Sequence, residues 1–180
     1  MSPTRQQLAI VGRKESPTLA ELARPMLRLA GLRIDPHTNG PHRTPGLTAI
    51  TLKRITDGRE TPVVVPSAAN LANIRFSPDG SRLAFTNTTD SAIELWVADT
   101  ASGRSRQVSG SDRVNGATGE PCTWLKDNVT ILCRIVPPDR APAPVEPAVP
   151  AGPTVLENHA KAAPAPTYED MRVVTNVGNT

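Results

Sequence analysis

The sequence predicts an all-β fold built from short antiparallel strands. Short apolar runs alternate with tight-turn residues along the first three quarters of the chain, and part of this pattern is repeated. The 180 residues include 19 prolines and 12 glycines. Their combined share of the chain exceeds the roughly 12% that proline and glycine make up in an average protein. This composition is typical of strands, turns and linkers. We expect a partial β-propeller of about two to three blades, followed by a Pro/Ala-rich linker.

The clearest strand pattern lies between Asn73 and Val108. It contains the turn Ser77-Pro78-Asp79-Gly80, in which Pro presets φ, Asp bonds back to the backbone and Gly accepts a positive φ. Four short strands in about 35 residues are typical of one propeller blade. These strands are predicted at residues 74–76, 82–86, 93–98 and, as a short edge strand, 104–108.

A second hairpin is predicted at residues 121–135, with a two-residue turn at Asp127-Asn128. Counting back from this turn sets Cys122 opposite Cys133, so a cross-strand disulfide is geometrically possible. The same count puts the two cysteines at a hydrogen-bonded pair, where side chains stand farther apart. A disulfide and two small half-buried thiols therefore both remain open.

The first 65 residues are predicted to form an imperfect copy of the same unit. Residues 2–11 match residues 77–86 in their Ser-Pro start and in a Leu-Ala-apolar strand. The predicted strand at residues 27–34 likewise resembles residues 93–99. This repeat predicts two units and part of a third.

Two further features complete the first unit. Pro25 argues against a helix over residues 18–30, because proline disrupts a helix interior. A hairpin around Asp57-Gly58, with strands at residues 47–55 and 61–65, then completes the sheet.

We divide the chain into a partial β-propeller at residues 1–135, a Pro/Ala-rich linker or loop at 136–167 and a frayed tail at 168–180. The middle segment has no hydrophobic periodicity, which is typical of extended, polyproline-like chain. The tail ends in polar residues that fit no element.

Charge and hydropathy exclude several classes of partner. The chain has 20 Lys and Arg against 17 Asp and Glu, and no basic run is long enough for a phosphate-binding stripe, so no nucleic-acid partner is expected. No apolar stretch reaches the roughly 20 residues that span a bilayer, so no membrane partner is expected either. Residues 1–13 lack the apolar core of a signal peptide, which predicts a cytoplasmic chain as written.

No catalytic, cofactor-binding or metal-binding residue is predicted. The nearest approach to a Gly-x-Ser-x-Gly nucleophile elbow lies at residues 103–107 and lacks the final Gly, so Ser105 is interpreted as an edge-strand serine. Solvated loop positions are favoured for the histidines over a metal site, which requires three or four rigidly held ligands. The three histidines are His37, His42 and His159.

Two further patterns also have ordinary interpretations. Residues 110–119 contain Gly110, Gly116 and Gly119 but lack the Lys-Ser/Thr ending of a phosphate loop, which favours a loop between blades. A positive excess in the first third could attract acidic peptides, although alternating strand positions favour a solvated face. The residues concerned are Arg24, Arg28, Arg33, Arg43, Lys53 and Arg54.

Several stretches resemble a known family. Residues 76–85, followed by residues 94–99 and Gly103, resemble the propeller repeat of the prolyl oligopeptidase family and of TolB-like proteins. The flanking sequence narrows the resemblance to the amino-terminal propeller region of the bacterial glutamyl-endopeptidase-like branch. This flanking sequence comprises residues 20–25, 27–36 and 116–125, and the whole resemblance covers roughly residues 2–171.

The resemblance implies a parent serine peptidase that is periplasmic or secreted. In such relatives a β-propeller covers an α/β-hydrolase domain with a Ser, Asp, His triad, and it restricts entry to peptide substrates. This chain stops before any hydrolase domain, and after Met171 it no longer follows the family pattern. The expectation is therefore a non-catalytic propeller fragment, with no activity alone and no cofactor.

Two alternatives remain open at this point. The chain could be a stand-alone TolB-like, propeller-type module that binds a protein partner, or it could complement a separately encoded hydrolase domain in trans. An incomplete ring is expected to expose apolar blade faces, which predicts marginal folding. The side chains expected to be exposed are Leu83, Phe85, Leu95 and Val97.

Overall fold

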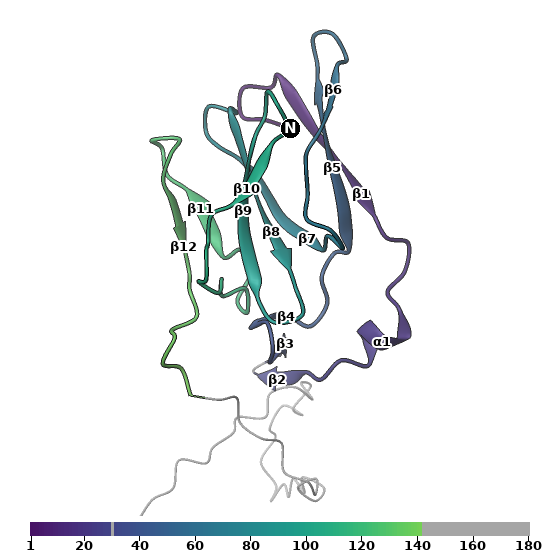
Figure 1. The fold of residues 1–180 in the computed structure, drawn as a ribbon, viewed down its shortest axis with the longest axis vertical. Coiled ribbons are helices and arrows are strands. Elements are labelled where there is room, and N and C mark those ends of the chain that lie inside the picture. Colours follow the sequence, from purple (N-terminus) through teal and green to yellow (C-terminus); the bar gives the residue numbers. More distant parts are fainter. Residues whose placement is uncertain (30, 142–180) are drawn as a thin grey trace, which may run out of the picture.

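The computed structural model describes residues 1–29 and 31–141, which are strand and turn except for a single-turn helix, α1 (Leu19–Leu22). All strand pairs are antiparallel, and the sheets remain open within the described residues (Figure 1). The predicted all-β class is confirmed, and the open sheets are consistent with a partial propeller. None of the helical structure in this part of the chain is long and apolar enough to span a bilayer.

The largest sheet has seven strands in the order β1-β5-β7-β8-β9-β10, with β6 also paired to β5. Its strands are β1 (Gln7–Arg13), β5 (Leu47–Arg54), β6 (Glu60–Pro62), β7 (Leu71–Phe76), β8 (Arg82–Thr88), β9 (Ile93–Asp99) and β10 (Ser105–Gln107). Two small sheets accompany it. They are formed by β2 (Leu27–Leu29), β3 (Leu32–Asp35) and β4 (Gly40–Pro41), and by β11 (Cys122–Trp124) and β12 (Ile131–Cys133).

The seven-stranded sheet is divided into two parts at a single residue pair, Leu47 with Leu71. One part contains β1, β5 and β6, and the other contains β7 to β10. Apolar side chains from both parts form the first core. Its buried members are Ile50, Leu52, Val63, Leu71, Leu83, Phe85 and Ala98.

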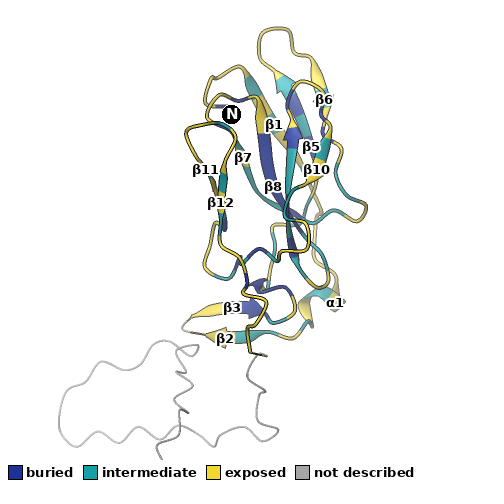
Figure 2. Cartoon of the chain, turned by 60° about the vertical axis from the view of Figure 1, so that its left-hand side comes forward, coloured by how far each residue is buried: buried dark blue, intermediate teal, exposed yellow. Residues whose placement is uncertain are grey.

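The second core lies on the opposite face of β7 to β10, under the β11–β12 hairpin. Its buried members are Ala84, Ile93, Leu95 and Val114. Consecutive strand residues point to opposite faces, so Leu83 and Phe85 enter the first core while Ala84 enters the second. The inner strands β8 and β9 are therefore covered on both faces. In Figure 2, β8 is buried along most of its length, whereas the edge strand β10 is largely exposed.

This arrangement corrects the expectation of exposed blade faces. Leu83 and Phe85 are fully buried and Leu95 is 6% exposed, while Val97 is half-buried. The prediction considered one blade alone, whereas neighbouring segments of the same chain cover this blade in the structure.

The predicted Ser-Pro repeat is present as a pair of matching turns. The Ser2 N–H donates to the Gln7 carbonyl (2.8 Å), as the Ser77 N–H donates to the Arg82 carbonyl (2.9 Å). In each turn the serine hydroxyl also accepts from the same strand residue, Gln7 N–H or Arg82 N–H. The strands that follow, β1 and β8, are equivalent.

The predicted partner of the first repeat strand is wrong. Residues 27–34 do not form one strand, because Gly31 at φ 82° lies between β2 and β3, which pair as a small hairpin. The strand equivalent to β9 is β5 instead. Gln7 of β1 pairs with Arg54, just as Arg82 of β8 pairs with Asp99.

The equivalence continues into the next turn and strand. The Gly58 N–H donates to the Arg54 carbonyl, as the Gly103 N–H donates to the Asp99 carbonyl. The edge strands β6 and β10 then start at matching pairs, Glu60 with Lys53 and Ser105 with Ala98. The first unit differs by a long insertion, residues 14–46, where residues 89–92 connect β8 to β9.

The helix α1 lies in this insertion and ends before Pro25, so no helix spans residues 18–30. It is held by a capping box: the Glu21 carboxylate accepts from the Thr18 N–H at 2.6 Å, and the Thr18 hydroxyl accepts from the Glu21 N–H. The Thr-x-x-Glu spacing in the sequence could have indicated this turn. The Thr18 N–H, then the Lys14 and Thr18 side chains, lower the Glu21 pKa to about 2.

Candidate functional site

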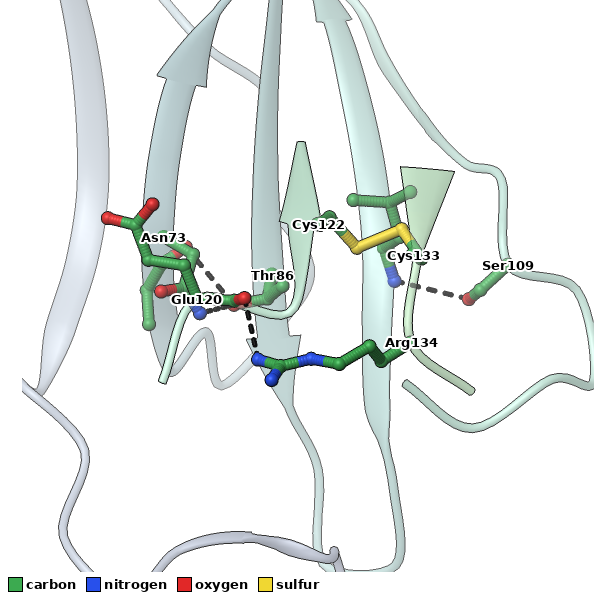
Figure 3. The surroundings of a disulfide bond; sticks show 9 residues. Asn73, Thr86, Ser109, Glu120, Cys122, Cys133 and Arg134 are labelled. Carbon is green, nitrogen blue, oxygen red and sulfur yellow. Dashed lines mark hydrogen bonds between the residues drawn. A yellow bond between two sulfur atoms is a disulfide. The ribbon is translucent and has the colours of Figure 1, made fainter. Parts of the chain in front are cut away.

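The β11–β12 hairpin carries the cysteine pair that the sequence singled out. Cys122 pairs directly with Cys133, and a disulfide joins them with their Cα atoms 4.2 Å apart (Figure 3). The predicted hairpin and its register are therefore present in the structure.

The predicted hydrogen-bonding position of this pair is wrong. The Leu125 N–H donates to the Thr130 carbonyl, and the Arg134 N–H donates to the Pro121 carbonyl. Because hydrogen-bonded and non-hydrogen-bonded pairs alternate, the cysteines occupy a non-hydrogen-bonded pair, where Cα atoms lie closer. The reason is that residues 126–129 form a four-residue loop, not the two-residue turn that the sequence predicts.

An acidic side chain orders the tip of the hairpin, and the tip contacts the turn that precedes β8. The Asp127 carboxylate accepts from the Thr130 hydroxyl and backbone, and the hydroxyl contributes most to lowering the Asp127 pKa. Asn128, at φ 61°, accepts a hydrogen bond from the Asp79 N–H at 2.9 Å through its side-chain oxygen. The loop therefore touches the Ser77-Pro78-Asp79-Gly80 turn.

The middle and base of the hairpin make further polar contacts. The Trp124 indole N–H donates to the Arg75 carbonyl (3.2 Å). The Arg134 guanidinium, below the disulfide in Figure 3, donates to the Glu120 carbonyl at 2.7 Å and to Thr118. Glu120 in turn forms an ion pair with Arg75. The disulfide thus lies within a network that fastens the hairpin over the second core.

A pocket of about 300 Å³ lies between the end of β3 and the segment that follows β12, and both polar and apolar residues line it. Asn39 donates to Asn115 through its side chain (2.7 Å) and accepts from Arg140. Arg113 donates to the His37 carbonyl, while its Nε is buried without a hydrogen-bond partner. Most polar groups of this pocket already have partners within the chain.

The remaining sequence candidates are one serine and three histidines. The Ser105 hydroxyl in β10 donates to the Val64 carbonyl. His37 is exposed, as expected, but His42 is half-buried and its Nδ1 is buried without a hydrogen-bond partner. His159 lies outside the described residues. Within residues 1–29 and 31–141, no three His, Cys, Asp or Glu side chains are placed to hold a metal ion.

The glycine-rich segment at residues 110–119 connects β10 to β11.

Basic residues of the first third of the chain make exposed ion pairs. Each pair contributes little to stability because solvent screens it. Lys53 pairs with Glu60, Arg54 with Asp57 and Arg24 with Asp90.

These features define a class: an all-β module of stacked antiparallel sheets, built from a repeated strand unit and fastened by one disulfide hairpin. No family model matches the chain.

The chain is similar to two plant proteins described as probable chloroplastic glutamyl endopeptidases. The Arabidopsis thaliana protein is 33% identical over 182 residues, and the Oryza sativa subsp. japonica protein is 30% identical over 183 residues. Each alignment covers 94% of this chain and 19% of the relative, so the chain spans about a fifth of the relatives' length.

Among solved structures, an acylaminoacyl peptidase from Pyrococcus horikoshii covers 57% of this chain and 15% of its own, with 21% identity and a TM-score of 0.39. The sequence matches show that this chain is related to a region of glutamyl endopeptidases, the branch of the prolyl oligopeptidase family that the sequence motifs resemble.

Proposed function

We propose that this chain is a non-catalytic, propeller-type region of a serine peptidase that hydrolyses peptide bonds. The observation that carries the proposal is the similarity to glutamyl endopeptidases along 94% of the chain. The stacked antiparallel sheets support it, because propeller blades bury their faces against one another in this way. In the whole protein this region would guide peptide substrates toward a separate hydrolase domain.

The test is whether the purified chain labels or cleaves as a serine peptidase. We expect no cleavage of fluorogenic peptides with Glu before the scissile bond, and no labelling by a fluorophosphonate. A bacterial glutamyl endopeptidase assayed in parallel confirms that the substrates are competent. Cleavage that the fluorophosphonate abolishes would contradict the proposal, and its loss in Ser105→Ala would identify Ser105 as the nucleophile.

A stand-alone protein-binding module is the second candidate. It is favoured by the burial of both faces of the inner strands β8 and β9, since these strands need no further chain to cover them. Affinity purification of the tagged chain from its native cells separates the two proposals. Recovery of a hydrolase-domain polypeptide supports the peptidase region, whereas a different stoichiometric partner supports the binding module.

We further propose that the parent protein acts in an oxidising compartment such as the periplasm. Structural disulfides persist there and are rare in the reducing cytosol, and Cys122 and Cys133 form such a pair. Mass spectrometry of alkylated native protein tests this point. Recovery of both residues as alkylated thiols would contradict it.

A further inference from the structure

The strand β1 forms one edge of the seven-stranded sheet, with β5 as its neighbour (Figure 1). Its counterpart β8 is an inner strand, because β7 pairs with its other side. The internal repeat therefore supplies a comparison for the open side of β1: the place that β7 occupies beside β8 has no occupant beside β1 among the described residues.

The same repeat shows which residues of β1 direct their backbone N–H and C=O groups toward β5 and which direct them toward the open side. The Ile55 N–H donates to the Gln6 carbonyl, as the Thr100 N–H donates to the Ser81 carbonyl. Because antiparallel pairs alternate, Leu8 and Ile10 exchange hydrogen bonds with β5. Ala9 and Val11 consequently direct their N–H and C=O groups toward the open side.

The counterparts of Ala9 and Val11 show what these groups can bind. Ala84 and Thr86 of β8 lie opposite Arg75 and Ala72 of β7. On the same side of β8, the Thr88 N–H donates to the Asn70 carbonyl at 2.9 Å. An added strand at β1 would meet the same ladder of donors and acceptors.

The side chains of β1 leave this edge unprotected. Residues 8–12 are Leu-Ala-Ile-Val-Gly, with no charge and no proline, and the register shift lies at the end, between Gly12 and Arg13. Leu8, Ile10 and Val11 are 38%, 46% and 41% exposed. Edge strands that avoid pairing carry charges, prolines or central bulges, and β1 has none of these within residues 8–12.

We propose that the β1 edge binds an extended segment of another polypeptide by antiparallel strand addition, in the register in which β7 pairs with β8. The partner has the chemistry of β7, Leu71–Phe76: five or six extended residues without proline. Its apolar side chains would lie on the same face as the exposed Leu8 and Ile10 and cover them. Main-chain hydrogen bonds to Ala9 and Val11 provide the affinity, and the alternate side chains provide the specificity.

The probe is a fluorescent peptide with the sequence of residues 70–76, titrated into the full chain and followed by anisotropy. We expect saturable binding, with the Ala9 and Val11 amides becoming protected from hydrogen exchange. N-methylation of the probe at the position of Ala72 removes a donor that faces β8 in the intramolecular pair. It should weaken binding at least tenfold, whereas N-methylation at Leu71, which faces away, should change the affinity less than threefold.

A protein variant tests the same edge from the other side. Val11→Pro removes an open-side N–H and should abolish binding, while Val11→Thr keeps the N–H and should preserve it. If Val11→Pro does not fold, the two methylated probes decide the question with the unaltered protein. Absence of saturable binding, equal affinities for the two methylated probes, or β1 amides already protected in a dimer would each overturn the proposal.

Discussion

The two repeat units have the same turns and the same strand registers, but very different surroundings. In the first unit, β1 and β5 bury one face against strands β7 to β9, and Ile10 of β1 is 46% exposed. In the second unit, Phe85 occupies the position of Ile10 and is fully buried. Local turn chemistry therefore specifies the shape of a unit, while its neighbours along the chain determine how much of it is buried.

The largest expected difference between the units is the effect of core truncation. Phe85→Ala should lower the free energy of unfolding by about 3–5 kcal/mol, because it empties the fully buried space beside Trp96. Ile10→Ala at the equivalent exposed position should lower it by less than about 1 kcal/mol. Urea unfolding followed by Trp fluorescence measures both. Equal losses would show that the units are buried alike.

Removal of the disulfide should have the next largest effect. The double variant Cys122→Ala, Cys133→Ala opens a loop with a sequence separation of 11, for which chain entropy predicts a loss of about 2–3 kcal/mol. Hydrogen exchange should increase most in β11 and β12 and in the β9 segment beneath them. Unchanged exchange in the hairpin would mean that Arg134, Trp124 and Asn128 hold it without the bridge.

A smaller effect is expected from exchanging the residues at the matching positive-φ positions of the two turns. Gly80 has φ 77° and Arg5 has φ 57°. Gly80→Ala should lower stability by about 1 kcal/mol, because an L side chain is strained there and its Cβ would lie 3.2 Å from Thr4 Oγ1. Arg5→Gly should raise stability by a few tenths to about 1 kcal/mol. Opposite signs in thermal unfolding confirm the equivalence of the turns, and equal signs contradict it.

The smallest expected difference is in acid sensitivity. Asp79 accepts hydrogen bonds from the Ser77 hydroxyl and from Ser81, which lower its pKa, whereas the equivalent Thr4 does not titrate. A lowered folded-state pKa stabilises the fold above the unfolded-state value, about 3.9, and this contribution is lost as the pH falls through the folded-state pKa. Asp79→Asn should therefore reduce the pH dependence of stability below about pH 4. An unchanged acid limb would exclude this turn as a source.

Local sequence signals predicted most of the strands. The turn Ser77-Pro78-Asp79-Gly80 carries its own hydrogen bonds, so its geometry and the strands on either side follow from about ten residues. The hairpin register that places Cys122 opposite Cys133 was likewise predictable from strand alternation.

Features that depend on distant partners were not predictable in this way. The choice of β5 over residues 27–34 as the partner of β1 depends on pairing across the insertion, which a local pattern does not contain. The buried contact between Phe85 and the first core depends on β5, and the loop after Trp124 depends on the docking of Asn128 against Asp79. Predicting each of these three features requires knowing how the neighbouring sheets are arranged.

Residue-resolved hydrogen exchange of the native chain tests the comparison between the units most directly. Ala84 and Thr86 of β8 should exchange slowly because β7 pairs with them, and the equivalent Ala9 and Val11 of β1 should exchange at least a hundredfold faster. Slow exchange at Ala84 and Thr86 with fast exchange at Ala9 and Val11 is the predicted result. Equal protection of the four amides would contradict the account, because it would show that β1 is not an open edge.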